Sequence, residues 1–374
     1  MIPFNKPFLT GKETYYIEQA VQSGKISGNG VFTQKCQAFF ENQYGFKKAL
    51  LTTSCTDALE MCALLIGCGP EDEIIVPSYT FVSSALAFVR QGVKVVFADS
   101  EAQNPNLDVS KLETLITPKT KAIVVVHYAG VAVDMDEVMR LSRKYNLVVI
   151  EDAAQAIDSY YKGKPLGSIG HLAAFSFHET KNVIAGEGGL LAINDKKYVE
   201  RAEIIWEKGT NRASFFRGEI NKYGWVDTGS SFLPSEIIAA FLWAQLENLV
   251  AIQNKRKVLW DSYCDGLKSL EEKGKLHLPQ IPEYASNNAH MFYLVCDSLS
   301  TRTSLITNLK EKNIHAVFHY LSLNKSDFYL KDNKNVTLSN ADRFSDTLVR
   351  LPFYYDLTTT EQQKVIQAIQ DFYA

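Results

Sequence analysis

Apolar positions in the first 200 residues follow two different spacings. Short runs rich in β-branched residues recur at intervals, which is typical of buried strands. These runs are Ala49–Leu51, Glu73–Pro77, Val93–Asp99, Ala122–His127, Leu147–Asp152, Ala173–His178 and Gly189–Asn194. Between them, apolar residues recur at helical spacing, most clearly in Thr56–Ile66 and Met135–Tyr145. The alternation of strands and helices predicts a parallel sheet with helices on both faces.

The chain before the first strand predicts two helices. Apolar residues between Tyr16 and Val21 share one helical face, and Cys36–Phe40 form a second apolar face. Thr33 is the expected N-cap of the second helix, because a threonine hydroxyl can accept a hydrogen bond from the first helical turn.

The pattern changes after about residue 209. Gly209–Phe232 is rich in Gly, Ser, Asn and aromatic residues, and a loop of this length in a compact domain is usually functional. A long helical region is expected from Pro234 to about Lys273. The rest is expected to form strands at 292–296 and 316–319 and helices at 301–312 and 361–372. We therefore predict a large domain at residues 1–250 and a long connecting helix plus a small α+β domain at residues 251–374.

Composition narrows the class of protein. The chain has 374 residues, of which 46% are hydrophobic and 22% charged, with a formal net charge of −3, as expected for a folded globular protein. No basic stripe indicates a nucleic-acid partner. No apolar run approaches the roughly 18 residues of a membrane span, and the N-terminus does not resemble a secretory signal, so the expected location is cytoplasmic. The six cysteines include no CxxC pair or zinc-type spacing, so no metal site is expected.

Candidate chemistry lies just after the strands, because ligands of open α/β sheets bind at the carboxyl ends of strands. Thr53–Thr56 lead into a helix with small hydroxyl-bearing residues, so the helix start could hold a phosphate or simply be a plain N-cap. Tyr79 or Phe81, after the next strand, could face a planar ligand or belong to the core.

Two ionisable residues follow later strands. Asp152 ends an apolar strand and needs a cationic partner if it is buried, although it could instead cap the next helix. Lys181 lies between a hydroxyl-bearing strand and the Gly-rich segment Gly186–Gly189. A lysine in such a pocket can lose its proton and attack a carbonyl group.

Together these residues match the needs of pyridoxal phosphate (PLP). Its phosphate needs N–H and O–H donors, its ring needs a flat apolar face, its pyridine nitrogen needs an anion, and its aldehyde needs a lysine. The chain supplies these groups in the order phosphate cup, aromatic, Asp152, Ser176 and Lys181.

Several motifs carry a family resemblance over nearly the whole chain. They are Ile2–Pro7, Gly28–Gly30, Pro77–Val82, Val126–Gly130, Glu151–Gln155, Ser176–Asn182 and Leu351–Phe353. With them the sequence resembles the DegT/DnrJ/EryC1/StrS family of PLP-dependent sugar aminotransferases. The resemblance implies the fold-type I α/β architecture, with a large mixed, mostly parallel sheet, a small C-terminal α+β domain, and a homodimer with shared active sites.

Residue roles follow from the resemblance by position. Lys181 matches the Schiff-base lysine, which also moves the proton between cofactor and substrate carbons. Asp152 matches the partner of the pyridine nitrogen, and Gln155 the residue near the phenolic oxygen. Phe81 matches the aromatic residue that stacks on the ring, and Asn182 is expected to line the same pocket. The remaining matches are Ser54, Cys55, Thr56 and Ser176 at the phosphate, Ser231 at the partner's phosphate, and His319 and Tyr320 near the sugar nucleotide.

The sequence departs from the family pattern in two places. The phosphate loop often reads Gly-Thr, whereas this chain has Cys55–Thr56; only the backbone N–H of Cys55 is required there, and a redox role of its thiol is the lesser alternative. The loop from the partner chain often reads Asn-Tyr-Arg, whereas this chain has Ser231-Phe-Leu233. Ser231 has less reach than Asn, and Leu233 removes any contact made by the arginine.

Three segments refine the expected activity: Glu207–Arg212, His290–Tyr293 and Ala316–Tyr320. They resemble enzymes that transfer the amino group of L-glutamate to C4 of dTDP-4-dehydro-6-deoxy-D-glucose. The products would be 2-oxoglutarate and dTDP-4-amino-4,6-dideoxy-D-galactose, a precursor of a cell-surface polysaccharide such as enterobacterial common antigen.

Other functions remain open to different degrees. The closest alternative is the same chemistry with another C4 stereochemistry or at C3. A dehydratase of the same fold would replace Lys181 with histidine, and a non-catalytic nucleotide-sugar binding protein would not need the Lys181–Asp152 pair. A Rossmann dehydrogenase is disfavoured, because no G-x-G-x-x-G follows the first strand.

Overall fold

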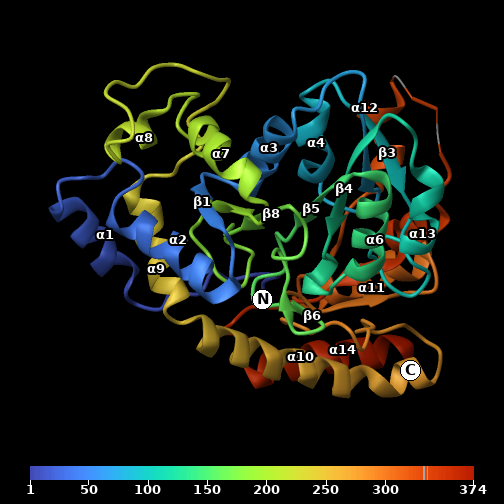
Figure 1. The fold of residues 1–374 in the computed structure, drawn as a ribbon. Helices are drawn as coiled ribbons and strands as arrows, with labels where there is room; N and C mark the ends of the chain where they lie inside the picture. The colour runs from blue at the N-terminus through green and yellow to red at the C-terminus, as the bar shows by residue number, and fades with distance from the viewer. Residues whose placement is uncertain (332, 335) are drawn as a thin grey trace.

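A seven-stranded mixed sheet organises the larger part of the computed structural model, which describes residues 1–331, 333–334 and 336–374 (Figure 1). The strand order is β1-β9-β8-β5-β4-β2-β3. The strands are β1 (Lys48–Thr52), β2 (Glu73–Pro77), β3 (Lys94–Ala98), β4 (Thr120–Val126), β5 (Val148–Asp152), β8 (Leu172–Ser176) and β9 (Gly189–Ile193). β3, β2, β4, β5 and β8 run parallel, whereas β9 is antiparallel to both β8 and β1.

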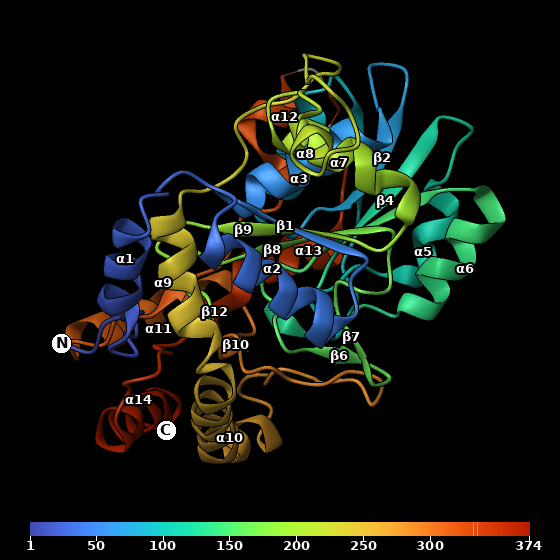
Figure 2. The same cartoon turned by 60° about the vertical axis from the view of Figure 1, so that its left-hand side comes forward.

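Helices cover both faces of this sheet (Figure 2), because successive residues of each strand point to opposite sides. Ile74 and Val76 pack into one apolar cluster, and Ile75 between them packs into the other. The first cluster includes α3 (Cys55–Ile66), α4 (Ser83–Val89) and α7 (Val199–Trp206). The second includes α1 (Glu13–Gln22), α2 (Val31–Tyr44), α5 (Val109–Leu112), α6 (Met135–Tyr145) and α9 (Glu236–Leu246).

A small antiparallel sheet, ordered β10-β12-β11, organises the C-terminal part. Its strands are β10 (Tyr293–Val295), β11 (Val317–Phe318) and β12 (Leu348–Arg350). α10 (Leu249–Glu272) and α14 (Thr359–Tyr373) lie side by side along the lower edge of the molecule (Figure 1), and α11 (Leu299–Glu311) packs with them in a third apolar cluster. The other strands and α-helices of the described residues are β6 (Tyr160–Tyr161), β7 (Lys164–Pro165), α8 (Arg212–Phe216), α12 (Asp327–Leu330) and α13 (Ser339–Thr347).

The predicted strands agree closely with the large sheet. The long helical region expected from Pro234 to about Lys273 is helical and consists of two helices, since α9 ends at Leu246 and α10 begins at Leu249. The strand β12 (Leu348–Arg350) was not predicted. The loop at 209–232 contains the short helix α8. The predicted domain boundary between residues 250 and 251 falls after the second residue of α10 and stays a prediction.

Thr33 is not an N-cap, because the second helix begins at Val31 after Gly30. A distant carboxylate satisfies the start of this helix instead. Buried Glu236 accepts hydrogen bonds from the amides of Gly30 (2.9 Å), Phe32 (2.7 Å) and Thr33 (3.0 Å), and from the Thr33 hydroxyl. This arrangement joins α2 to α9, and an anion at a helix start is favourable.

Within the described residues, no helix combines the length and the apolar character that crossing a bilayer requires.

Candidate active site

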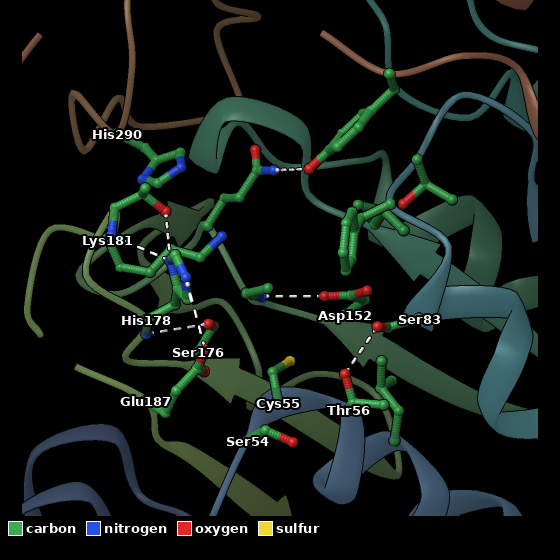
Figure 3. A pocket seen from close by; sticks show the side chains of 18 of the residues that line it. Ser54, Cys55, Thr56, Ser83, Asp152, Ser176, His178, Lys181, Glu187 and His290 are labelled. Carbon is green, nitrogen blue, oxygen red and sulfur yellow. Dashed lines mark hydrogen bonds and ion pairs between the residues drawn. The ribbon is translucent and has the colours of Figure 1, made fainter. Parts of the chain in front are cut away.

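A cavity of about 650 Å³ lies at the carboxyl ends of the central strands (Figure 3). It contains ten of the twelve sequence-predicted site residues: Ser54, Cys55, Thr56, Phe81, Asp152, Gln155, Ser176, Lys181, His319 and Tyr320. Its other lining residues are Thr53, Leu59, Thr80, Ser83, Val126, Ala154, His178, Thr180, Glu187, His290 and Arg350. Asn182 and Ser231 do not line it.

The start of α3 forms one side of the cavity. Ser54 caps this helix by accepting a hydrogen bond from the amide of Asp57 (3.1 Å). The amides of Cys55 and Thr56 lie in the first turn of α3, where backbone N–H groups have no intrahelical acceptor. The helix dipole gives this end of α3 a partial positive charge. The Thr56 hydroxyl lies 2.8 Å from that of Ser83. Backbone and hydroxyl donors therefore converge where an anion can bind.

Gly189 allows β9 to approach this helix start. A Cβ atom on Gly189 would lie 2.3 Å from the carbonyl carbon of Ser54 and 2.5 Å from the amide nitrogen of Cys55. Gly189 is also paired with Thr52 of β1 and Ser176 of β8. The ends of β1, β8 and β9 thus meet at Gly189, where the start of α3 leaves no room for a side chain.

Lys181 reaches the cavity from the loop after β8, opposite Asp152 (Figure 3). Its amide donates to the carbonyl of His178 (2.9 Å), which holds the backbone in a tight turn. The pKa of the Lys181 amine is lowered to about 8, chiefly by burial; the charge of Arg350 acts in the same direction, while Cys55 and Asp152 oppose the shift. A substantial fraction of neutral amine is therefore present near neutral pH.

Asp152 ends β5 and is 5% exposed. Its carboxylate accepts hydrogen bonds from the Ser84 hydroxyl (2.6 Å) and the Ala154 amide (3.1 Å). Burial raises the pKa of Asp152, while these hydrogen bonds and the charge of Lys181 act in the opposite direction. A cationic ligand atom beside the carboxylate would stabilise its charged form.

The Cys55 thiol is unsuited to redox chemistry. Burial raises its pKa well above the ordinary value, and the neighbouring Asp152 carboxylate adds to the shift. The thiolate that reacts with oxidants is therefore disfavoured.

Aromatic and polar side chains from both sheets close the cavity opposite α3. Phe81 is 56% exposed, and its ring centroid lies 6.1 Å from that of Tyr320. Gln155 donates to the Tyr320 hydroxyl (3.0 Å) and accepts from the amide of Ala129 (2.6 Å). His319 Nδ1 lies 2.7 Å from the Tyr128 hydroxyl, so Gln155 and His319 are held in defined orientations.

Asn182 lies behind the cavity and positions His290, which sequence reasoning did not assign to the site. Its amide nitrogen donates to Gln253 (2.8 Å) and to the carbonyl of Asn288 (2.9 Å). Its oxygen therefore remains as the acceptor for His290 Nδ1 (2.7 Å). This network places the proton of His290 on Nδ1, and burial lowers its pKa well below the ordinary value, so the ring is neutral.

The two histidines that end strands have different positions. His127 is fully buried, accepts from the amide of Val133 (3.2 Å) and pairs with Glu151 (3.0 Å), so it is a structural residue. His178 lines the cavity and lies 3.7 Å from Glu187.

Ser231 lines a second cavity of about 610 Å³. Its other lining residues are Lys25, Ser27, Gly28, Asn29, Gln34, Glu207, Lys208, Arg212, Phe216, Leu233 and Ser235. Ser231 pairs with Glu207 in an isolated bridge and is not brought to the first cavity of its own chain.

The donor set of the first cavity fits PLP. The helix start matches a phosphate, the buried Asp152 matches a protonated pyridine nitrogen, and Lys181 matches an aldehyde. Arg350 was also not assigned from the sequence; its only signal was its position directly before the motif Leu351–Phe353. In the described part of the chain, no group of three or more His, Cys, Asp or Glu is placed to hold a metal ion.

Comparison with known proteins agrees with this site. Residues 8–370 match the model of the DegT/DnrJ/EryC1/StrS aminotransferase family. The spore coat polysaccharide biosynthesis protein SpsC of Bacillus subtilis (strain 168) is 30% identical over 379 residues, covering 99% of this chain and 96% of SpsC.

Two solved structures show the same fold. DesV from S. venezuelae is 28% identical, with a TM-score of 0.90 over 99% of this chain and 98% of DesV. The PLP form of Spr1654 from Streptococcus pneumoniae is 25% identical, also with a TM-score of 0.90 over 99% and 98% of the two chains. These matches confirm the predicted fold-type I architecture, an aminotransferase, and PLP as its cofactor. The chain is a member of the DegT/DnrJ/EryC1/StrS aminotransferase family.

Proposed function

We propose that this protein transfers the amino group of L-glutamate to C4 of dTDP-4-dehydro-6-deoxy-D-glucose. The products are 2-oxoglutarate and dTDP-4-amino-4,6-dideoxy-D-galactose, a cell-surface polysaccharide precursor. The observation that carries the proposal is the convergence of Lys181, Asp152 and the start of α3 on one cavity. The likeness to SpsC, named for polysaccharide biosynthesis, supports a sugar substrate. The dTDP group, C4 and the galacto configuration rest on the segments at 207–212, 290–293 and 316–320, and L-glutamate as the donor rests on the family resemblance.

The residues of the cavity have different proposed roles. Lys181 would hold the aldehyde carbon of PLP, Asp152 would face the pyridine nitrogen, and Ser54, Cys55, Thr56 and Ser176 would hold the phosphate. When bound, PLP supplies an electron sink for the carbon that loses a proton. Lys181 Nζ is the group that removes and returns this proton, because its amine is partly neutral near pH 7. The buried carboxylate of Asp152 stabilises positive charge opposite it.

Substrate recognition is assigned to the side of the cavity formed by the small sheet. His319 and Tyr320 are proposed to contact the sugar nucleotide. Tyr320 has a positive φ of 56°, a costly backbone conformation for a bulky residue. The hydrogen bonds of Gln155 and Tyr128 to these two side chains hold them toward the cavity.

The active unit is proposed to be a cytoplasmic homodimer in which Ser231 contacts the phosphate of the partner's PLP. Exposed apolar side chains near the second cavity support a partner surface there. Phe216 lines that cavity and is 69% exposed, and Trp225, from the same segment, is 84% exposed. Covering such side chains is favourable.

The test starts from the visible absorption of the purified PLP-loaded protein. Adding L-glutamate should remove the absorption of lysine-bound PLP, and adding the dTDP-4-ketosugar should restore it. Lys181→Ala should lack the lysine-bound absorption and all turnover, whereas the exposed-surface control Lys364→Ala should behave as the unmodified protein. Activity of Lys181→Ala would refute the assigned chemistry.

NMR of the product then determines which carbon carries the amine and whether the amine is axial or equatorial. An equatorial C4 amine or a C3 amine would contradict the proposed product while leaving the aminotransferase chemistry intact. An absence of spectral change with any donor would instead favour a nucleotide-sugar binding protein.

A further inference from the structure

A cavity of about 220 Å³ lies where the large-sheet part of the chain meets the small sheet. We call it the interface cavity. It is lined by Ala102, Gln103, His277, Leu278, Gln280, Tyr293, Val295, Arg343 and Phe344. The first two come from the segment between β3 and α5, and the others come from β10, from the segment before it and from α13. The interface cavity shares no lining residue with the active-site cavity.

Hydrogen bonds between the two parts of the chain fix the walls of the interface cavity. Asp99, which directly follows β3, accepts from the amide of Ala341 (2.8 Å) in the first turn of α13. Arg343 Nη2, from the same helix, donates to the carbonyl of Ala102 (2.5 Å). Because α13 is attached to the large-sheet part at both points, the cavity is a fixed feature of the fold.

The lining combines an apolar surface with a cation. Four of its side chains are apolar and each at most 4% exposed: Leu278, Tyr293, Val295 and Phe344. Arg343 supplies the cation, and its Cζ lies 4.2 Å from the ring centroid of Phe344. No lining residue is acidic.

The charge of Arg343 is not compensated by the protein. Its guanidinium donates to a neutral carbonyl, and it forms no ion pair with a carboxylate of the described residues. Burial lowers the pKa of this guanidinium, so its charge has lost part of its hydration. An anion beside a desolvated cation stabilises the charged form. The interface cavity is therefore complementary to an anion that also carries an apolar group.

The size of the interface cavity limits the ligand. Pockets that enclose drug-sized ligands have volumes of about 300–1,000 Å³. A cavity of about 220 Å³ is smaller, which excludes a whole nucleotide sugar. The ligand expected here has on the order of ten non-hydrogen atoms.

One wall of the interface cavity is connected to the sugar side of the active site. The ring centroid of Tyr293 lies 5.7 Å from that of Tyr128, whose hydroxyl lies 2.7 Å from His319 Nδ1. His319 is one of the residues proposed to contact the sugar nucleotide. A ligand against Tyr293 therefore lies two side-chain contacts away from His319.

We propose that the interface cavity is a second ligand site, which binds a small carboxylate with an apolar body and thereby changes the affinity for the nucleotide sugar. The remaining N–H groups of Arg343 match a carboxylate, and the apolar side chains cover the body of the ligand. The binding of the carboxylate does not depend on the proposed function, whereas its effect on the nucleotide sugar rests on it.

The first experiment measures the binding of benzoate to the PLP-loaded protein by calorimetry. Benzoate joins one carboxylate to one apolar ring, and a Kd of about 1 mM is expected for so small a ligand. Arg343→Met should weaken this binding about 10-fold or more, because the charge-assisted hydrogen bonds are lost. Ala102→Phe should have the same effect, because the exposed Ala102 lets a ring fill the cavity. Benzyl alcohol, the neutral analogue, should bind more weakly than benzoate.

Two variants serve as controls for the position of the bound benzoate. Arg302→Met is matched to Arg343→Met, because Arg302 also lies over a phenylalanine ring (5.6 Å) but lines a groove elsewhere. Arg350→Met removes the cation of the active-site cavity. Both variants should bind benzoate as the unmodified protein does.

The second experiment measures the effect on the nucleotide sugar. The affinity of the PLP-loaded protein for the dTDP-4-ketosugar is measured without an amino donor, in the presence and absence of saturating benzoate. Benzoate should change this affinity by about fivefold or more, as is typical of coupled sites. The effect should be absent in Ala102→Phe, which cannot bind benzoate.

Four outcomes would overturn the inference. The first is no binding of benzoate well above the expected Kd. The second is loss of binding in Arg350→Met but not in Arg343→Met, which would place benzoate in the active-site cavity. The third is equal loss in Arg302→Met, which would indicate unspecific association with exposed cations. The fourth is an unchanged affinity for the nucleotide sugar, which would refute the coupling. If the unmodified protein does not bind the dTDP-4-ketosugar, the substrate in the proposed function is wrong, whereas the benzoate measurement still tests the interface cavity.

Discussion

The lowered pKa of Lys181 leads to a quantitative prediction. Burial brings the pKa of its amine from 10.5 to about 8. At pH 7 about 10% of such an amine is neutral, compared with about 0.03% for an ordinary lysine, a ratio of roughly 300. Because only the neutral amine acylates, Lys181 should react far faster than surface lysines at neutral pH. Its reactivity should level off above pH 8 rather than above pH 10.

Competitive labelling tests this prediction on the cofactor-free protein. Trace acetic anhydride is added across pH 6–11, and mass spectrometry quantifies acetylation of Lys181 against the exposed Lys364. Two substitutions test whether neighbouring charges contribute to the pKa of Lys181, and they should shift this pKa in opposite directions. Asp152→Asn removes a negative charge that raises the pKa, so the midpoint should fall. Arg350→Met removes a positive charge that lowers it, so the midpoint should rise.

A midpoint of Lys181 near 10.5 would refute the argument from burial. A shift in the same direction in both variants would show that charge is not the cause, because the two substitutions remove charges of opposite sign. Circular dichroism of each variant is the control for folding.

Three further predictions concern other parts of the chain. Asp152→Asn should lower kcat about 100-fold or more with an unchanged circular dichroism spectrum, because the pyridine nitrogen loses its anion; near-full activity would remove this assignment. Ser231→Ala should weaken PLP retention in the dimer, measured by equilibrium dialysis; unchanged affinity would place Ser231 outside the site. Glu236→Ala should lower the free energy of unfolding by about 3 kcal/mol in urea titrations, because three buried amides lose their acceptor; a change below about 1 kcal/mol would contradict this account.

The residues of the candidate site could be predicted from the sequence more fully than the residues that set their pKa values and orientations. The strands that end at Asp152 and Ser176 could be recognised because they are short, apolar and β-branched, and parallel strands bring their ends to one edge. Arg350 could not be placed, because its position in the cavity depends on how the small sheet packs against the rest of the molecule. His290 could not be placed either, since its orientation depends on Asn182, which is 108 residues away in the chain.

Local sequence therefore determined which segments are strands and helices and which side chains follow them, because both depend on neighbours within a few residues. The family motifs added the expected roles of these side chains, from Cys55 to Lys181. Tertiary structure alone decided the protonation states, because the pKa of Lys181 and the neutral ring of His290 depend on burial by distant segments. It also decided that Glu236, and not Thr33, satisfies the start of α2, and that Arg350 lines the cavity. These contacts join residues that are far apart in the sequence, so a pattern among neighbouring residues cannot predict them.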